Sequence, residues 1–512
     1  MEAADPPPPP RTRKMGRGAA NSDEPESEEA APHHEPPPPP LAWGSRRARR
    51  QVPSLGDGGG GEEGYDCISR LPDALLGVII SLLPTKDGGR TQTLAKRWRP
   101  LWRTVPLNLD DGDLAAADGV ALAGLVSRIL LAHAGPGRRF CIAAQHLHDR
   151  PAMVEGWLGS PALSNLEELE FFVPEAHYYR GPLLPPPPST FRFSATLRVA
   201  GISQCRLPDC TALTLRFPQL RLLALQQVNI STDSLHRVIA GCPALEGLLL
   251  KRCYGYRCLR INSPTIRSIA FHSPCCGGRC VGEVDHHLED VIIEDAPCLE
   301  RLLHVERAIG LGVRVSVISA PKLETLGVLD DLDDNYSRLN FGTAVAFKGF
   351  EVVNFTAPVS SVKVLALIMD SLCLDRVIEL MRCFPCLEKL YITAIQYGET
   401  NSWRRKHRST LRSLDICLKT VVLDDYHGMK SQVNFATFFI WNASKLKTMT
   451  FMGGVNNGNE YFVAQQLRQL QLEKRASRDA QFRFTSKQCL YDLVHIKHVH
   501  DLSLADPFEC TC

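Results

Sequence analysis

A short hydrophobic rhythm recurs along the middle of this chain and limits what the chain can fold into. Apolar residues occupy positions 0, 3 and 5 of a short segment, and several of these segments start 21 to 25 residues apart. Alternate residues of a strand point to the same side, so each segment completes its core only when a neighbour stacks on it. The rhythm predicts a solenoid, and it is carried by Leu166/Leu169/Phe171, Leu220/Leu223/Leu225, Leu245/Leu248/Leu250, Ile266/Ile269/Phe271, Leu323/Leu326/Val328, Val362/Leu365/Leu367, Leu387/Leu390/Ile392 and Leu411/Leu414/Ile416.

The spacing of these segments is in the range of leucine-rich repeats, and the repeat that starts at Leu245 reaches Cys253 where such repeats favour Asn or Cys. Leu299/Leu302/His304 breaks the pattern. In the clearest repeat, Leu249 and Lys251 alternate with residues expected to be buried, which makes them candidate substrate-binding residues. The alternative is a leucine-rich α/β structure without a repeat.

The segment from Asp66 to Asp111 combines two helical signals in DCISRLPDALLGVIISLLPTKDGGRTQTLAKRWRPLWRTVPLNLDD. Pro72 suits the start of a helix, and the apolar residues from Leu75 to Leu83 exceed what one face needs. Thr85 to Asp87 offer cap residues for a second helix, and an apolar stripe at helical spacing follows, formed by Leu94, Trp98, Leu101 and Trp102. So short a segment cannot bury all of this surface alone, which indicates a partner.

The pattern LPDxLLxxIxSxLPTKD…RT…LxKRWRxLW resembles the plant F-box, a three-helix module that docks onto the Skp adaptor of a cullin-based ubiquitin ligase. The alternative is an ordinary helical hairpin. Gly88-Gly89 departs from the family pattern, and because two interior glycines cost about 1 kcal/mol each relative to alanine, we expect the second helix to fray or start late. The resemblance implies that residues serving the adaptor groove or the module's own core are Leu71, Pro72, Leu75, Leu76, Ile79, Leu82, Leu83, Leu94, Trp98 and Trp102.

Towards the C-terminus, STLRSLDICLKTVVLDDYHGMKSQVNFATFFIWNASKLKTMTF resembles the FBD module, a companion of plant F-box leucine-rich proteins. The usual acidic residue after the glycine is replaced in Ser431-Gln432-Val433-Asn434. We expect a strand, a helix from about Val433 and a strand from Lys447, which together cap the solenoid. The residues that carry the resemblance are Lys419, Val421, Leu423, Tyr426, Gly428, Phe435, Phe438, Asn442, Ala443 and Leu446.

Together these segments predict an α+β multidomain chain. We expect a disordered Pro/Gly-rich tail at residues 1–63, because such a composition buries too little apolar surface to order itself. The three-helix F-box follows at 64–110, and then an irregular leucine-rich-repeat α/β solenoid at 111–404. The FBD module spans 405–485, and residues 486–512 form a C-terminal tail that matches no motif. The basic cluster at 46–50 is either a nuclear import signal or part of a solvated tail.

Composition narrows the class of partner. The net charge of +2 gives no general reason to expect nucleic acid or membrane binding. The polar N-terminus is not a secretory signal, and no apolar run is long enough to span a bilayer, so we expect a protein of the nucleus or the cytoplasm. The eighteen cysteines are spread along the chain and are expected to be reduced thiols.

Two clusters suggest metal chemistry without a spacing that supports it. The first contains zinc-type donors around a Gly-Gly, but its spacing is not that of a known finger, and a flexible insertion between repeats explains it better. The second, an acidic run at 330–334, is either a cation or basic-patch site or a solvated turn. We therefore expect no metal and no cofactor. The donors of the first cluster are His272, Cys275, Cys276, Cys280, His286 and His287.

The chain also lacks a Gly-rich phosphate loop, a G-x-S-x-G elbow and an H-E-x-x-H pair, so we expect no catalytic residues. The resemblance implies the non-catalytic substrate-recognition subunit of a Skp-cullin-F-box ubiquitin ligase. Its partners would be a Skp-type adaptor, a cullin scaffold reached through that adaptor, and an unknown protein substrate. The alternatives are a leucine-rich-repeat scaffold with a weak or vestigial F-box and, from the Cys275 region alone, a metal-dependent regulator.

Overall fold

The computed structural model describes residues 68–509 except 69, 115, 117, 175–178, 180, 273–286, 306–311, 332–337, 397–400, 404–414 and 487–492. The described residues belong to one compact unit, Cys67–Cys512. Several features singled out above lie outside them: the Pro-rich tail with its basic cluster, the region from Cys275 to His286, and the repeat positions Leu411 and Leu414. No helix of the described parts is long and apolar enough to cross a membrane.

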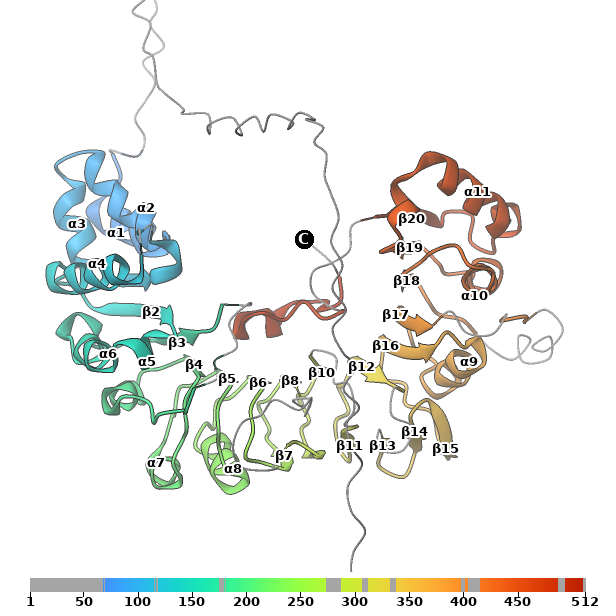
Figure 1. The fold of residues 1–512 in the computed structure, drawn as a ribbon, viewed down its shortest axis with the longest axis horizontal. Helices are drawn as coiled ribbons and strands as arrows, with labels where there is room; N and C mark the ends of the chain where they lie inside the picture. Colours follow the sequence, from blue (N-terminus) through green and yellow to red (C-terminus); the bar gives the residue numbers. More distant parts are fainter. Residues whose placement is uncertain are drawn as a thin grey trace, which may run out of the picture. The chain divides into compact units, whose positions relative to one another are not determined.

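A helical module, residues 70–104, precedes the sheet (Figure 1). It consists of α1 (Asp73–Leu82), α2 (Thr85–Arg90), the 3-10 turn η1 (Thr91–Thr93) and α3 (Trp98–Thr104).

The second helix of this module does not start late, since it begins at Thr85, but it is short. The hydroxyls of Thr91 and Thr93 donate back to the carbonyls of Gly88 and Arg90, at 2.6 and 2.8 Å. These bonds tighten the chain into a 3-10 turn after a glycine pair of low helix propensity. The expected apolar stripe is therefore split, because Leu94 lies in the turn that precedes the helix carrying the two tryptophans.

One parallel sheet runs through most of the described chain (Figure 1). It has 14 strands, and each neighbouring pair is parallel. In spatial order the strands are β1 (Leu107–Asp110), β2 (Gly137–Ala143), β3 (Glu168–Phe172), β4 (Val199–Ser203), β5 (Leu222–Gln226), β6 (Gly247–Lys251), β8 (Ser268–Phe271), β10 (Arg301–His304), β12 (Thr325–Asp330), β16 (Val364–Ser371), β17 (Lys389–Gln396), β18 (Thr420–Asp424), β19 (Thr448–Met452) and β20 (Gln481–Thr485).

The repeat rhythm accounts for one face of this sheet. The apolar residues at its three positions are buried in a single core cluster in every described repeat, with one exception. Val328 turns to the opposite face, because the pairing of β12 with β16 shifts register beyond Leu326 and Gly327 has a φ of +141°.

The expected break in the pattern at Leu299/Leu302/His304 does not interrupt the sheet. Leu299 and Leu302 are buried, and β10 pairs with β8 on one side and with β12 on the other. The histidine takes the inward place of a leucine because its ring stacks on Phe271, with ring centroids 5.1 Å apart.

Two kinds of structure cover the core face. Helices pack at both ends, and their apolar residues belong to the same core cluster as the strands. They are α4 (Gly119–Ala132), α5 (His146–Asp149), α6 (Pro151–Leu158), α7 (Asp209–Thr214), α8 (Thr232–Ala240), α9 (Leu374–Cys383), α10 (Lys430–Asn442) and α11 (Glu460–Leu470). Further 3-10 turns are η2 (Asp111–Asp113), η3 (Pro161–Leu163), η4 (Pro188–Phe193), η6 (Val455–Gly458), η7 (Leu472–Lys474) and η8 (Val499–Ser503).

Between α8 and α9 a second sheet takes the place of helices (Figure 1). Its spatial order is β15-β14-β13-β11-β9-β7; the β13–β14 and β14–β15 pairs are antiparallel, and the other pairs are parallel. The strands are β7 (Cys258–Asn262), β9 (Asp290–Asp295), β11 (Arg314–Val317), β13 (Arg338–Phe341), β14 (Val345–Lys348) and β15 (Glu351–Phe355).

The C-terminal strands continue the main sheet. The expected order of strand, helix and strand is present as β18, α10 and β19, with the helix beginning at Lys430, three residues before Val433. Lys389 to Thr393 of β17 pair in register with Thr420 to Asp424 of β18. The last strand before the predicted boundary at residues 404 and 405 and the first described strand after it are therefore neighbours in one sheet.

Candidate functional site

An apolar patch is exposed on α1 of the helical module. Four apolar residues of α1 lie at i, i+3, i+4 and i+7 and are 40% to 66% exposed: Leu75, Val78, Ile79 and Leu82. This spacing places the four side chains on one side of the helix. We call them the α1 patch. Leu94, in the turn before α3, is also exposed.

Three residues predicted to serve the adaptor or the core belong to the core alone. Leu76, Trp98 and Trp102 are buried and form a small cluster with Ile80. Leu76 and Ile80 are four residues apart and face inward, opposite the α1 patch, so α1 is apolar on two sides. Burial removes these three side chains from direct contact with a partner. Of the remaining predicted contacts, Leu71 and Leu83 are half-buried and Pro72 is exposed.

The helical module is joined to the sheet by hydrogen bonds at one corner. The hydroxyl of Thr85 donates to the carbonyl of Asn108 at 2.6 Å and accepts from the backbone N–H of Asp110 at 2.8 Å. The Asn108 amide donates to the carbonyl of Ser81, so α1 and α2 are both tied to β1. These bonds fix the direction in which the α1 patch faces relative to the first strand.

His133 supports the same corner from α4. Its Nε2 lies 2.9 Å from the carbonyl oxygen of Val105, and its ring meets Trp102 edge-on at 5.4 Å. Burial lowers the pKa of His133, which favours the neutral ring that fits this contact.

We call the face of the main sheet opposite the helices the strand face. The charge of its side chains changes along the sheet. The face is acidic at β3, where Glu168 and Glu170 lie, and basic at β17, where Lys389 lies beside Tyr391. Between these ends the face is mainly apolar, although Ser268 and Arg301 also lie on it, with the Arg301 guanidinium donating to the Ser268 hydroxyl. The apolar residues form a second cluster separate from the main core. On the sheet they are Val199, Ala224, Leu249, Ala270, Leu303, Val305, Val328, Ala366, Ile368 and, on β18 beyond the basic end, Val422.

Leu249, predicted to be an exposed substrate-binding residue, is only 2% exposed in this structure. The C-terminal segment, residues 493–509, covers it and completes the second cluster. Lys251, the other candidate, lies at the end of the same strand and is half-exposed. The apolar side chains that the C-terminal segment adds are Leu493, Val494, Ile496, Val499, Leu502 and Phe508.

Polar contacts hold the C-terminal segment at two places. The Asp506 carboxylate lies 2.6 Å from the Lys389 ammonium and accepts from the Tyr391 hydroxyl at 2.8 Å. At β3, His498 lies 3.7 Å from Glu170. The nearby Glu170 carboxylate raises the pKa of His498, so the imidazolium form is favoured there.

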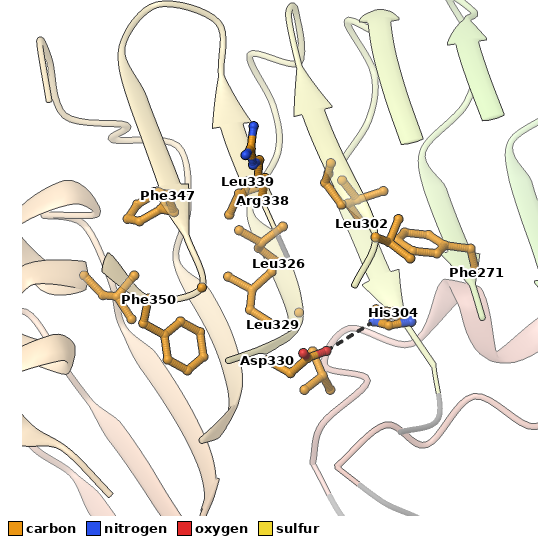
Figure 2. A pocket seen from close by; sticks show the side chains of 16 residues that line it. Phe271, Leu302, His304, Leu326, Leu329, Asp330, Arg338, Leu339, Phe347 and Phe350 are labelled. Atoms are coloured by element: carbon orange, nitrogen blue, oxygen red, sulfur yellow. Dashed lines mark ion pairs between the residues drawn. The ribbon is translucent and has the colours of Figure 1, made fainter. Parts of the chain in front are cut away.

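A small cavity of about 50 Å³ lies between the two sheets (Figure 2). His304 and Asp330 face each other at its edge, with Nδ1 and a carboxylate oxygen 3.9 Å apart, and Leu302, Leu326 and Phe347 line its interior. Burial, together with the neighbouring His272, lowers the pKa of His304 to about 3. Organic ligand sites are typically about 300 to 1,000 Å³, so this cavity is too small for such a ligand.

The acidic run contains a residue with a structural role. Asp331 is buried, pairs with Arg376 of α9 and accepts from the backbone N–H of Asp370 at 2.6 Å. The solvated-turn interpretation is therefore wrong for Asp331, and its carboxylate is already occupied. Residues 332–337 lie outside the described chain.

A buried acid–histidine pair was not predicted from the sequence. Asp111 and His146 have side chains only 1% exposed, with a carboxylate oxygen and Nε2 3.2 Å apart. Asp111 also accepts from the backbone N–H of Ala143 at 3.0 Å, so it links η2 to β2 and α5. Across the described parts of the chain, no group of three or more His, Cys, Asp or Glu residues is placed to hold a metal ion.

Comparison with known proteins follows the same division of the chain. Residues 154–392 match the model for the repeats of the FBD-associated F-box protein At5g56370, and residues 406–451 match the FBD model. The FBD-associated F-box protein At5g60610 of Arabidopsis thaliana is 27% identical over 75% of this chain and 98% of its own length.

Two other similar Arabidopsis thaliana proteins are covered less fully. The F-box/FBD/LRR-repeat protein At3g52680 is 30% identical over 47% of this chain and 53% of its own length. The F-box/FBD/LRR-repeat protein At4g00160 is 28% identical over 52% of each chain. The chain thus spans about half the length of these two relatives.

Proposed function

Because parts of the chain match the models for F-box-associated leucine-rich repeats and for the FBD domain, and the chain is similar to Arabidopsis thaliana F-box/FBD/LRR-repeat proteins, we propose that it is the substrate-recognition subunit of a Skp-cullin-F-box ubiquitin ligase. In this proposal the helical module is the F-box, which docks onto a Skp-type adaptor and through it onto a cullin. The repeats hold the protein that is to be ubiquitinated. The family supports a role in protein interaction, and this chain would supply no catalytic group.

The α1 patch is the observation that carries this proposal. Its four apolar residues are exposed although the module has a separate core made by Leu76, Ile80, Trp98 and Trp102. Apolar anchors at i, i+3, i+4 and i+7 are the pattern by which a helix lies in the apolar groove of another protein. A contiguous exposed apolar patch of this kind marks an interaction site.

The hydrogen-bonded corner between α2 and β1 supports a positional mechanism. Thr85 and Asn108 hold the module against the first strand, so a target on the sheet keeps a defined orientation relative to the adaptor. A ubiquitin-charged enzyme on the same complex then meets the target's lysines at a high effective concentration. The protein accelerates transfer by placement alone.

Adaptor binding tests the proposal. We expect the full-length chain to co-purify with a Skp-type adaptor and the double variant Ile79→Asp, Leu82→Asp to lose it, because two carboxylates in the α1 patch would have to be desolvated on docking. Leu131→Asp is the matched control, since Leu131 is 88% exposed on α4 and lies outside the patch. Circular dichroism would establish that all variants are folded. Failure of the wild-type chain to bind, or equal binding by all three chains, would refute the proposal.

The short α2 favours one other candidate, a leucine-rich-repeat scaffold with a weak F-box. With only six residues and two glycines, this helix presents little regular surface. A scaffold would bind its partner protein without promoting ubiquitin transfer. Reconstitution with adaptor, cullin and ubiquitin-charging enzymes separates the two functions, since only a receptor raises ubiquitination of a bound protein.

A further inference from the structure

We propose that the strand face is a peptide-binding surface and that the C-terminal segment is its built-in occupant. The proposal rests on the proposed function and names the class of target that the repeats would take. Such a target is a segment with an imidazole or cationic side chain, two apolar side chains three residues apart, and a carboxylate followed by an aromatic residue. The C-terminal segment has this order in His498, Val499, Leu502, Asp506 and Phe508.

Charge complementarity across the face supports this assignment. The acidic end at β3 faces His498 and His500, which lie 3.7 and 3.9 Å from Glu170 and Glu168. The basic end at β17 faces Asp506 of the C-terminal segment. A face with opposite charges at its two ends selects both the composition and the direction of a bound segment.

The middle of the face is shaped for the apolar pair. Gly247 of β6 has no side chain, and a Cβ atom there would come within 3.2 Å of Leu502 and 2.7 Å of Leu222. Ala224 and Ala270 on the neighbouring strands belong to the same cluster. Small residues on three adjacent strands make room in which Leu502 is buried, and the Ser268 hydroxyl donates to the Leu502 carbonyl at 3.0 Å.

The aromatic position has its own contact. Phe508 is buried, and its ring lies 5.4 Å from the ring of Tyr391. Its backbone N–H donates to Asp506 at 3.1 Å, so the carboxylate and the aromatic side chain are presented together. A target segment that supplied both groups in this spacing would reproduce the contact.

The segment can leave without breaking the sheet. The 14 strands are hydrogen-bonded to one another, and η8 is the only regular element within residues 493–509. The apolar side chains of the C-terminal segment belong to the second cluster, whereas the repeats are stabilised by the main core. An occupant on the same chain acts at an effective concentration in the millimolar range, so a target must compete with it.

A labelled synthetic peptide of residues 493–509 tests this inference by fluorescence anisotropy. The proteins are the full wild-type chain, a released chain carrying Val499→Asp and Leu502→Asp, and the control Leu504→Asp. Leu504 belongs to the same segment but is 41% exposed, so the control keeps the segment in place. We expect the peptide to bind the released chain at least ten times more tightly than the wild-type or control chain.

A charge exchange makes the test specific. Lys389→Glu in the released chain should weaken binding of the natural peptide, and Asp506→Lys in the peptide should restore it, because Lys389 and Asp506 form the contact at β17. If the released chain does not fold, the single variant Asp506→Lys takes its place in the comparison of peptide binding with the wild-type chain, since it breaks the Lys389 contact by repulsion and leaves the apolar residues unchanged.

Two results would overturn the inference: no peptide binding by a folded released chain, or equal binding by the wild-type and released chains. The adaptor assay measures binding through the α1 patch and does not depend on the strand face. A chain that binds the peptide but not the adaptor would therefore refute the proposed function alone, and the reverse result would refute only the inference.

Discussion

Removal of the Asp506 carboxylate should loosen the C-terminal segment without unfolding the repeats. In Asp506→Ala the Tyr391 hydroxyl loses its acceptor, and Tyr391 is only 3% exposed. A buried unsatisfied hydroxyl costs about 1 to 3 kcal/mol. Lys389 is 34% exposed and regains water, so its lost ion pair adds only about 0.5 to 1 kcal/mol.

The two terms add up to about 1.5 to 4 kcal/mol, and we take the middle of this range, about 2 to 3 kcal/mol, as the decrease in the free energy of local opening. Because 1.4 kcal/mol is tenfold in an equilibrium constant, hydrogen exchange at the amides of residues 493–509 should accelerate by roughly 30- to 150-fold. Exchange at the amides of β5 and β6 should change little, because these strands belong to the main core.

A second substitution separates the cost of the unsatisfied Tyr391 hydroxyl from the cost of the lost ion pair with Lys389. Tyr391→Phe removes the donor, so the double variant Asp506→Ala, Tyr391→Phe should open more easily than the wild-type chain by less than the sum of the two single changes, with a coupling of about 1 kcal/mol. Strict additivity would show that the hydroxyl does not depend on Asp506. Unchanged exchange in Asp506→Ala would refute the assigned anchor itself.

Three further outcomes are expected. Leu76→Ala should lower the free energy of unfolding in urea by about 2 to 4 kcal/mol, while Leu75→Ala on the exposed side changes it by less than about 0.5 kcal/mol; equal effects would contradict the assigned sides of α1. His304, with its pKa lowered to about 3, stays neutral in the folded chain while the unfolded chain gains a proton below about pH 6.5. Stability should therefore fall as the pH drops from 6.5 towards 3. In His304→Phe the urea midpoint should depend less on pH over that range, and an unchanged dependence on pH would count against the burial of His304. His498 has the opposite sign, since its pKa is raised by Glu170, so its contribution is full below pH 6.5 and is lost as the pH rises through the raised value. After correction for intrinsic rates, exchange in residues 493–509 should be faster at pH 8 than at pH 6, and His498→Asn should abolish that difference.

The repeat rhythm was sufficient to predict the core face of the sheet, because burial of every second residue leaves a period-2 trace in the sequence. Leu248 and Leu250 follow this trace and are buried as expected. The same trace says nothing about what lies on the other face. Leu249 was therefore expected at the surface, although a segment almost 250 residues later covers it.

Other features depend on contacts that leave no local pattern. Asp111 and His146 are separated by 35 positions, and neither residue type at its own position indicates burial. The strands of the second sheet lie between the segments that carry the repeat rhythm, and none of them contains a position of that rhythm. The α1 patch lies between these cases, because its apolar residues were recognised while their division between core and surface required the structure.

The register of β17 with β18 has a consequence for the stretch of the chain that matches the FBD model. The FBD model covers residues 406–451, which contain β18, α10 and β19. Cut out as a fragment, this stretch would expose the edge of β18 that bonds to β17 and the edge of β19 that bonds to β20. Unpaired strand edges invite aggregation. The stretch that the FBD model covers is therefore not an independent folding unit here, because its two strands complete their pairing only with β17 before it and β20 after it.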